Sequence, residues 1–355
     1  MKESLRGWFL GLLTIIRAAP TVSTVIGTEK PVLAVLCGDD QSRNLAESPV
    51  MQGIESSAVV RYTGEDGLAD ALDGADVLFV HDFLSQAVPG AWHAADRLKW
   101  LHIASAGVDP VMFPGLRDSD VVLTNSRGVF DDSIAEYVLG VILTFAKDLH
   151  GSLGLQRQKR WRHRETERIA GRRVLVVGTG PIGRAIARTL RAVGMSVSGS
   201  GRRAREGDPD FGTVHASAEL ADHLPGYDYV VVVAPLTEQT KGMFDAAAFA
   251  AMKPTARFVN VGRGELVVTA DLVEALRAGE LAGAALDVFD TEPLPTGSPL
   301  WTMDNVLVSP HMSGDFIGWR DTLLEVFADN FTRWQTGAPL RNVVDKQLGY
   351  VPSDR

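Results

Sequence analysis

The stretch Arg172-Arg173-Val174-Leu175-Val176-Val177-Gly178-Thr179-Gly180-Pro181-Ile182-Gly183 joins a short apolar run to three glycines spaced G-x-G-x-x-G. A helical pattern follows over residues 184–193, and a further short strand pattern follows residue 194. This order of strand, tight turn, helix and strand is typical of a dinucleotide-binding unit. A plain glycine-rich turn is the alternative, and the flanking patterns favour the dinucleotide.

Each position of the glycine motif has a physical role in this interpretation. Gly178 permits the turn, Gly180 lets the backbone approach a pyrophosphate, and Gly183 lets the helix pack close to the strand. The helix begins at Pro181 and Ile182, where unpaired N–H groups and the positive end of the helix dipole attract phosphates. We therefore expect these five residues to contact the cofactor.

Composition limits the classes of partner. The chain has 355 residues, enough for two domains, and its apolar (45%) and charged (22%) fractions are ordinary. The net charge of −9 argues against nucleic acid or an anionic membrane as the main partner. The single cysteine, Cys37, excludes an intrachain disulfide and a multi-cysteine metal site, and we expect no metal ion. Cys37 ends an apolar run, so we expect its side chain to be buried. A single cysteine fits a protein of the reducing cytoplasm, and we expect that location.

The N-terminal segment contains the only long apolar run near a terminus, residues 8–16, which follows Lys2 and Arg6. The run is too short to cross a membrane as a helix. No clear small-x-small cleavage site of a signal peptide follows it. We expect residues 1–30 to be an N-terminal extension, either poorly ordered or packed on the surface.

The next part of the chain, residues 31–130, reads as a small α/β domain. Short apolar runs alternate with helical segments such as 89–96, which predicts a parallel sheet covered on both faces. The predicted strands are 31–37, 58–62, 76–80, 100–104 and 121–125.

A long amphipathic pattern over 131–149 predicts one helix, which Asp131 or Asp132 could cap. Residues 157–173 then contain eight Lys or Arg against two Glu. We interpret this basic segment as a solvated connector, with Trp161 packing on the body, and not as a nucleic-acid patch.

The second α/β region starts at the glycine motif. A helix over 269–278, with Thr269 as its cap and Gly279 as its end, is predicted among the strands. A last helix covers 316–335 and ends at Gly337. The predicted later strands are 229–233, 257–261, 284–288 and 306–309. The fold class is α/β, with two Rossmann- or flavodoxin-like domains built on parallel sheets.

Four further stretches appear in order with the glycine motif. They are Ala234-Pro235-Leu236-Thr237, Val259-Asn260-Val261-Gly262-Arg263-Gly264-Glu265-Leu266, Leu286-Asp287-Val288-Phe289-Asp290-Thr291-Glu292-Pro293-Leu294-Pro295 and Val308-Ser309-Pro310-His311. Together they resemble the D-isomer-specific 2-hydroxyacid dehydrogenases, a family that includes phosphoglycerate dehydrogenase, glyoxylate/hydroxypyruvate reductase and D-lactate dehydrogenase. The resemblance covers residues 31 to about 345.

The resemblance implies catalytic roles for Arg263, Glu292 and His311. It implies a substrate loop, residues 106–109, whose backbone N–H groups hold the substrate carboxylate, and a contact between Asp287 and the nicotinamide carboxamide. The implied substrate residues are Ala106, Gly107, Val108, Arg263 and His311. Besides the glycine motif, the implied cofactor residues are Ala234, Pro235, Thr237, Thr240, Val261, Gly262, Arg263, Asp287, His311, Ser313 and Gly314.

The resemblance also implies the layout. Residues 31–130 plus 315–355 form a discontinuous substrate domain, and residues 131–314 form the cofactor domain, with the active site in the cleft between them. The family association is a homodimer built on the cofactor domains. The implied activity is NAD(P)H-dependent reduction of a small 2-oxo acid to the D-2-hydroxy acid.

The residue chemistry suits that reaction independently of the family. Histidine titrates near neutral pH, so His311 can donate a proton to the forming alkoxide, and Glu292 beside it would favour the imidazolium. Arg263 offers a planar cationic fork that matches a carboxylate. The alternatives are an exposed turn arginine, a surface acid and a strand-end histidine.

Most other histidines lack a matching context and are interpreted as structural or exposed. His81 is the exception, because it follows the predicted strand 76–80, whose end points toward the cleft in this fold. We therefore keep His81 as an additional candidate for the substrate pocket. The others are His93, His102, His150, His163, His215 and His223.

The residues at the end of the predicted strand that starts near residue 196 indicate the cofactor preference. An Asp or Glu about 20 residues past the first glycine usually holds the ribose 2′-hydroxyl. Here Arg202 and Arg203 stand at that place, and the first acid is Glu206. Forked donors suit a 2′-phosphate, and Ser200 could add a bond. We predict NADP(H) over NAD(H); the alternative is a solvated arginine-rich loop.

Three departures from the family pattern and two other functions stay open. Val268 stands where an acid or amide is common, and Phe316 and Trp319 either shape the pocket or pack the last helix. A dehydrogenase of another small anion, of the formate or phosphite type, uses the same scaffold. A dinucleotide-sensing, corepressor-like binding protein does so too.

Overall fold

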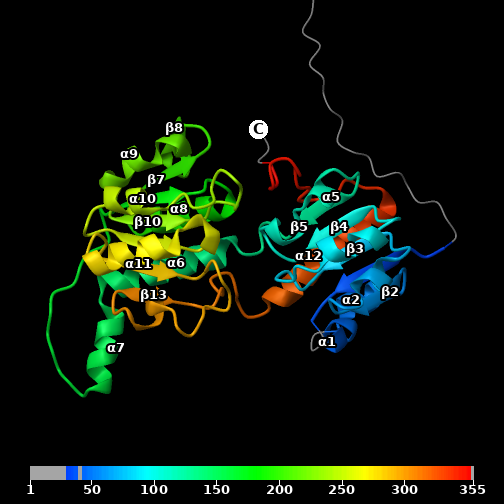
Figure 1. Cartoon of the computed structure of the whole chain (residues 1–355), viewed down its shortest axis with the longest axis horizontal. Helices are drawn as coiled ribbons and strands as arrows, with labels where there is room; N and C mark the ends of the chain where they lie inside the picture. The colour runs from blue at the N-terminus through cyan, green and yellow to red at the C-terminus, as the bar shows by residue number, and fades with distance from the viewer. Residues whose placement is uncertain (1–28, 39–41, 353–355) are drawn as a thin grey trace, which may run out of the picture.

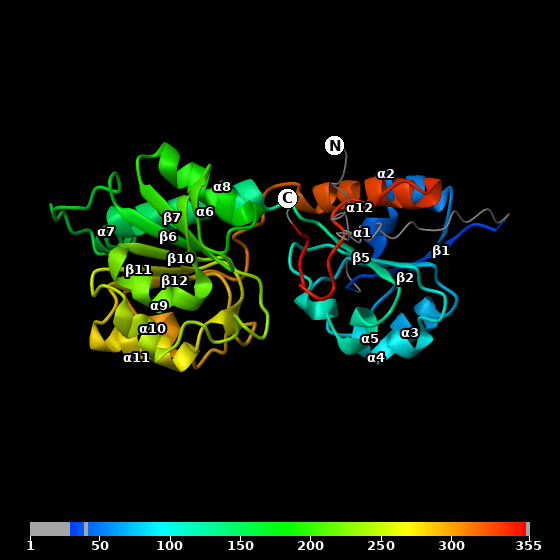
Figure 2. The same cartoon turned by 90° about the horizontal axis from the view of Figure 1, so that it is seen from above.

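The computed structural model describes residues 29–38 and 42–352, so nearly all of the expected N-terminal extension lies outside the described residues. The chain forms two α/β lobes that lie side by side (Figure 1). Each lobe has one sheet with helices on both of its faces, as the view from above shows (Figure 2). The predicted α/β class with two parallel sheets is confirmed.

The first lobe is built on a five-stranded sheet with the order β2-β1-β3-β4-β5, in which all pairs are parallel. The predicted strands are confirmed to within two residues, and Cys37 is buried as expected. The strands are β1 Val32–Leu36, β2 Val59–Thr63, β3 Val77–Val80, β4 Trp100–Ile103 and β5 Val122–Asn125. The α-helices are α1 Ser42–Ala46, α2 Pro49–Glu55, α3 Leu68–Leu72, α4 Val88–Ala91 and α5 Pro114–Arg117.

The last long helix, α12 (Trp319–Thr336), covers one face of this first sheet although it comes from the other end of the chain. Phe327 stacks on Phe79, with ring centroids 4.0 Å apart, and on Trp100 at 5.4 Å. The helix starts three residues later than predicted because Gly318, with a φ of 92°, is its N-cap. It ends before Gly337 as predicted.

The second lobe is built on an eight-stranded sheet with the order β13-β12-β11-β10-β6-β7-β9-β8. The antiparallel pair β8–β9 was not predicted from the sequence; the other pairs are parallel. Its strands are β6 Arg173–Val177, β7 Ser196–Gly201, β8 Arg205–Asp208, β9 Gly212–Ala216, β10 Tyr229–Val232, β11 Arg257–Asn260, β12 Gly283–Leu286 and β13 Val306–Val308. Its α-helices are α6 Asp131–Ala146, α7 Leu149–Arg157, α8 Pro181–Ala192, α9 Leu220–His223, α10 Ala246–Ala251 and α11 Thr269–Ala278.

The single helix predicted over 131–149 is wrong. Helix α6 ends at Ala146, and α7 starts at Leu149, bent by 61° from α6. Asp148 makes the break: it adopts a left-handed conformation (φ 46°), and its side chain caps α7 by accepting a hydrogen bond from the N–H of Gly151. Neither Asp131 nor Asp132 caps α6, whose N-cap is Phe130.

Among the described residues, no single helix has both the length and the apolar composition to cross a membrane. The bent pair of α6 and α7 passes that test of length and composition when taken together. Helix α6 is a core helix, since Ile134, Val138 and Ile142 are buried in the main apolar cluster.

Two smaller predictions also need correction. Trp161, in the basic connector, does not pack on the body; its relative exposure is 101%. The N-cap of α11 is Val268, and Thr269 is already inside the helix. The predicted end of α11 at Gly279 is confirmed, since that glycine adopts the left-handed conformation that closes a helix.

Candidate active site

The glycine motif forms a tight turn between β6 and α8. Gly178 has a φ of 117°, and a Cβ there would lie 2.7 Å from backbone atoms of Val233 and Ala234. A Cβ on Gly183 would lie 1.9 Å from the carbonyl oxygen of Gly178, so only glycine lets the helix approach the strand this closely. Around Gly180 the space is open, with nothing within 4 Å of a Cβ.

The N-terminus of α8 suits a phosphate. Pro181 is at the start of the helix, and no side chain caps it, so the N–H groups of the first turn are left for a ligand. Together with the open backbone at Gly180, this end of the helix fits the pyrophosphate of a dinucleotide.

At the end of β7 the structure separates the three residues expected at a 2′-phosphate. Ser200 is buried, and its hydroxyl has no hydrogen-bond partner among the described residues. Arg202 and Arg203 are exposed in the turn between β7 and β8. Arg202 places its guanidinium over the ring of Tyr350, 5.2 Å from the centroid. The two arginines are therefore better placed than Ser200 for an added phosphate.

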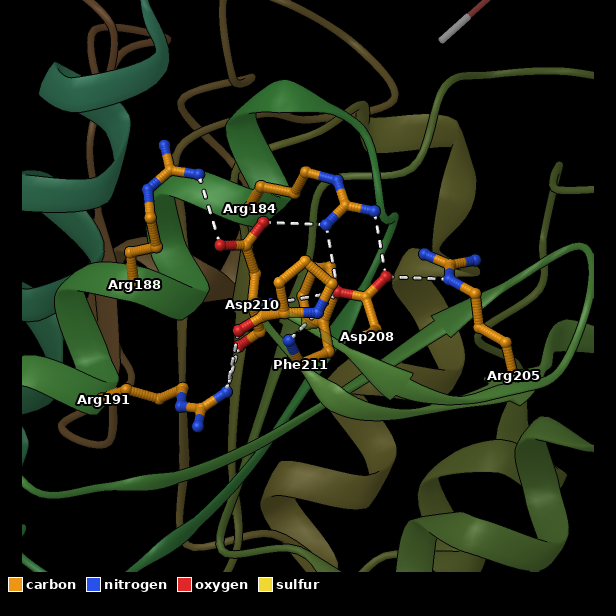
Figure 3. A network of polar contacts seen from close by, with 8 residues as sticks. Arg184, Arg188, Arg191, Arg205, Asp208, Asp210 and Phe211 are labelled. Carbon is orange, nitrogen blue, oxygen red and sulfur yellow. Dashed lines mark hydrogen bonds and ion pairs between the residues drawn. The ribbon is translucent and has the colours of Figure 1, made fainter. Parts of the chain in front are cut away.

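An arginine–aspartate network fixes the hairpin that follows this turn to helix α8 (Figure 3). Both terminal nitrogens of Arg184 donate to Asp208 at 3.0 Å, and Nη1 also donates to Asp210 at 2.7 Å. Arg205, in β8, donates to Asp208 at 2.8 Å. The turn that carries Arg202 and Arg203 is thus anchored beside the glycine motif.

Asp208 is the centre of this network, and its side chain is almost fully buried. Burial raises the pKa of Asp208, but the hydrogen bonds from Arg184, Arg205 and two backbone N–H groups outweigh it and hold the pKa well below its usual range. The carboxylate is therefore ionised at neutral pH and keeps Arg184 engaged in the hairpin.

His311 and Glu292 form a close pair. Nδ1 of His311 lies 2.8 Å from Oε2 of Glu292, while Oε1 accepts a hydrogen bond from the N–H of Phe289 at 2.8 Å. Burial raises the pKa of Glu292, but the hydrogen bonds from His311 and Phe289 outweigh it and hold the pKa below its usual value. The carboxylate fixes the ring, and Nε2 remains for a substrate.

The backbone around His311 is held in an uncommon conformation. His311 has a φ of 52°, a left-handed value that is rare for a residue with a side chain. Its N–H donates to the carbonyl oxygen of Asp287 at 2.8 Å. Such conformations persist where surrounding contacts impose them, and they cluster at functional sites.

Asp287 supplies those contacts from inside the protein. It is fully buried, and its carboxylate accepts hydrogen bonds from the hydroxyl of Ser309 and the N–H groups of Met312 and Ser313, all at 2.6–2.9 Å. Tyr137 in α6 lies 2.5 Å from the Ser309 hydroxyl. Asp287 therefore holds the loop that presents His311, a role that sequence reasoning missed; its implied contact with a carboxamide remains a proposal.

Arg263 follows β11 in the second lobe, and its side chain contacts residues of the first lobe. Its Nε donates to both carboxylate oxygens of Asp109, at 3.0 and 3.1 Å, and Nη1 donates to the Gly262 carbonyl oxygen at 2.9 Å. A Cβ on Gly107 would lie 1.9 Å from Nη2, so this nitrogen lies against the predicted substrate loop. An exposed turn arginine is therefore the wrong interpretation. The ion pair between Asp109 and Arg263 was missed, although Asp109 is the last residue of the predicted loop.

The substrate loop presents its N–H groups. The side chains of Ser105 and Asn125 donate to the carbonyl oxygens of Gly107 and Ala106 at 2.6 and 2.5 Å. The N–H groups of Ala106, Gly107 and Val108 make no hydrogen bond within residues 29–38 and 42–352. Carbonyls turned into the protein and unpaired N–H groups beside Arg263 suit a carboxylate.

His81 is placed as the strand pattern predicts, directly after β3. It is 6% exposed, and neither ring nitrogen has a hydrogen-bond partner in the described structure. Burial and the charge of Arg320 lower its pKa to about 4, so its imidazole is neutral at pH 7. His102, in contrast, is buried and bonded to Thr124 and Ser126, as expected of a structural histidine.

The remaining predicted cofactor residues lie in the segments that follow strands β10, β11 and β13. A turn after β10 is closed by hydrogen bonds of the Thr240 hydroxyl, and the N–H of Gly262 is held by the Asn260 side chain. Gly314 lies against Phe130. These remaining cofactor residues are Ala234, Pro235, Thr237, Thr240, Val261, Gly262, Ser313 and Gly314. Across the described ranges, no three His, Cys, Asp or Glu side chains are grouped to hold a metal ion.

Comparison with known proteins gives one consistent family. The family described as "D-isomer specific 2-hydroxyacid dehydrogenase, NAD binding domain" matches residues 139–313. A glyoxylate reductase from Thermococcus onnurineus is 32% identical over 265 residues, which cover 72% of this chain and 78% of that protein.

Two solved structures resemble both lobes. A D-isomer specific 2-hydroxyacid dehydrogenase from Xanthobacter autotrophicus, in complex with NADPH and MES, is 32% identical with a TM-score of 0.78. An NADPH-dependent glyoxylate/hydroxypyruvate reductase from Sinorhizobium meliloti, in complex with NADP and sulfate, is 30% identical with a TM-score of 0.78. Each match covers 91% of this chain and 100% of the other.

Proposed function

The chain belongs to the D-isomer specific 2-hydroxyacid dehydrogenase family, and we propose that it uses NADPH to reduce a small 2-oxo acid of the glyoxylate, hydroxypyruvate or pyruvate type to its D-2-hydroxy acid. The observation that supports this most is that two features lie near one carboxylate, since His311 and Arg263 are both close enough to act on the charge of Glu292. His311 is fixed by Glu292 at 2.8 Å, and Arg263 lies against the N–H groups of the loop at Gly107.

Each residue has a defined role in the proposed reaction. Arg263 and the N–H groups of residues 106–108 bind the substrate carboxylate. Nε2 of the protonated His311 donates its proton to the carbonyl oxygen as negative charge develops there, and Arg263 stabilises that charge. Glu292 stabilises the imidazolium. The bound cofactor supplies the hydride, so that oxo acid, NADPH and a proton give hydroxy acid and NADP⁺.

We propose that one lobe binds the substrate and the other binds the cofactor, as the family implies. We assign residues 31–130 plus 315–355 to the substrate domain and residues 131–314 to the cofactor domain. The packing of α12 on the first sheet and the position of the glycine motif in the second support this division.

The test is NADPH oxidation by the purified protein with glyoxylate, hydroxypyruvate and pyruvate in turn. We expect steady oxidation with at least one of them. Formate and phosphite, each with NADP⁺, test the alternative anion dehydrogenases. Tight NADPH binding without turnover of any of these compounds would instead favour a dinucleotide-sensing protein.

Replacing Arg202 with alanine tests the cofactor preference. The variant loses a charge-assisted bond to the 2′-phosphate, so KM for NADPH should rise by about ten- to a hundredfold while KM for NADH stays nearly unchanged. Steady-state kinetics with both cofactors measure the two changes. A wild-type protein that prefers NADH at equal concentration contradicts the assignment.

Replacing Glu292 with glutamine tests the proton donor's partner. The ionised Glu292 favours the protonated imidazole, and an amide does not, so the pH profile of reductive kcat/KM should move to lower pH. Glu280→Gln, an exposed acid on the same lobe, is the control. Identical profiles for Glu292→Gln and wild type would remove Glu292 from the mechanism.

We also propose a cytoplasmic homodimer built on the cofactor domains. Helix α7 projects from the second lobe (Figure 1) and exposes Leu149 and Leu153, and the connector after it exposes Trp161. Exposed apolar side chains on one projection favour a partner surface. A monomeric mass in light scattering at micromolar concentration would count against the dimer.

A further inference from the structure

The C-terminal segment, residues 342–352, lies between the two lobes (Figure 2). Hydrogen bonds attach this segment to the first lobe. The N–H of Val344 donates to the Leu123 carbonyl oxygen at 2.8 Å. Lys346 donates to three carbonyl oxygens at 2.5–3.1 Å, those of Leu116, Ser119 and Val121. The segment is therefore an ordered part of the first lobe.

A closed turn presents Tyr350 at the end of this segment. The N–H of Asp345 donates to the Tyr350 carbonyl oxygen at 3.1 Å, and the N–H of Gly349 donates to the Asp345 carbonyl oxygen at 2.8 Å. Gly349 adopts a left-handed conformation with a φ of 74°. Arg127 holds the residues just after the turn by donating to the carbonyl oxygens of Val351 and Pro352. The backbone on both sides of Tyr350 is thus held by hydrogen bonds.

The Tyr350 ring contacts the second lobe at Arg202, one of the two arginines predicted to bind the 2′-phosphate. The guanidinium of Arg202 lies 5.2 Å from the ring centroid, within the range of a cation–π contact. Arg203, the next residue, makes no hydrogen bond, ion pair or ring contact with any described residue. Of the two arginines at the end of β7, only Arg202 contacts a described residue of the first lobe.

We propose that Tyr350 is a positioning residue for NADPH, which holds Arg202 in the orientation that receives the 2′-phosphate. This inference rests on the proposed use of NADPH. Among the described residues Arg202 makes no hydrogen bond or ion pair besides this ring contact, so its N–H groups remain for the oxygens of a phosphate. Ordering one long side chain before binding reduces the entropy lost when the ligand binds. A residue of the first lobe, Tyr350, thereby contributes to the choice of cofactor through its contact with Arg202.

Binding of 2′,5′-ADP and of 5′-AMP to the full chain, measured by calorimetry, tests this without catalysis. The two probes differ only in the 2′-phosphate. Tyr350→Leu should weaken 2′,5′-ADP by about two- to fivefold, as expected for the loss of an exposed cation–π contact, and leave 5′-AMP unchanged. Tyr350→Phe keeps the ring and should bind both probes as wild type does.

Double variants separate positioning from a general structural effect. In the Arg202→Ala background, Tyr350→Leu should have no further effect on 2′,5′-ADP, whereas in the Arg203→Ala background its effect should remain. Equal weakening of both probes by Tyr350→Leu would overturn the proposal. So would tighter 2′,5′-ADP binding, which would show that the segment obstructs the site.

The outcomes also distinguish this inference from the proposed cofactor. If the wild-type protein binds 5′-AMP as tightly as 2′,5′-ADP, the use of NADPH is refuted and, with it, the role of Tyr350. A wild-type preference for 2′,5′-ADP that is undiminished in Tyr350→Leu refutes the role of Tyr350 alone.

Discussion

Replacing His311 with alanine should lower kcat for 2-oxo acid reduction by about a hundredfold or more, the usual contribution of a positioned proton donor. Glu292 fixes the ring at 2.8 Å through Nδ1, so Nε2 is the atom that must deliver the proton. Without it, water has to protonate the forming alkoxide. KM should change little, because the carboxylate is bound by Arg263 and the substrate loop. Steady-state kinetics with saturating NADPH measure both parameters.

The backbone at this position requires a second variant. His311 adopts a φ of 52°, where alanine is strained but asparagine is tolerated, so His311→Asn removes the acid with less disturbance of the loop. Both variants should lose activity while binding of NADPH, followed by its fluorescence, is retained. His93→Ala, at an exposed histidine of the first lobe, should leave kcat unchanged. Wild-type kcat in His311→Asn would exclude the proposed proton donor.

Replacing Arg263 with alanine should damage both kcat and KM, with a combined loss in kcat/KM of about a hundred- to a thousandfold. Its cation binds the carboxylate in the ground state and stabilises the oxyanion in the transition state. Kinetics across a wide range of substrate concentration separate the two effects. A change in KM alone would limit Arg263 to substrate binding.

Arg263→Lys tests the geometry of the fork. Lysine keeps the charge but cannot make the bonds to Asp109 and Gly262 while also facing Gly107, so we expect it to restore only part of the lost activity. Arg333→Ala, which removes an arginine paired with Asp329 on the surface, is the control and should behave as wild type. Full activity in Arg263→Lys would show that charge alone suffices.

The sequence predicted the elements whose causes are local. Buried parallel strands read as short apolar runs, and the turn at Gly178 needs a residue that tolerates positive φ, so both are visible without tertiary contacts. The motifs around Arg263, Glu292 and His311 were visible because each lies in a segment that follows a strand of the second sheet, although their roles stay predictions.

Other features depend on contacts between distant residues and could not be predicted. The break between α6 and α7 has no proline or glycine at its centre; it is made by the left-handed Asp148, which Arg164 also contacts. The β8–β9 hairpin has few apolar residues, and its anchor is the tertiary pairing of Asp208 with Arg184. The pair of Asp109 with Arg263 joins residues 154 positions apart.

The central claim is that this chain transfers a hydride from NADPH to a 2-oxo acid with D stereochemistry. Its most direct test is the chirality of the product formed from hydroxypyruvate with one equivalent of NADPH, determined by chiral chromatography. We predict D-glycerate in an amount equal to the NADPH consumed. L-glycerate would contradict the account, and so would NADPH that is bound but not consumed with glyoxylate, hydroxypyruvate or pyruvate.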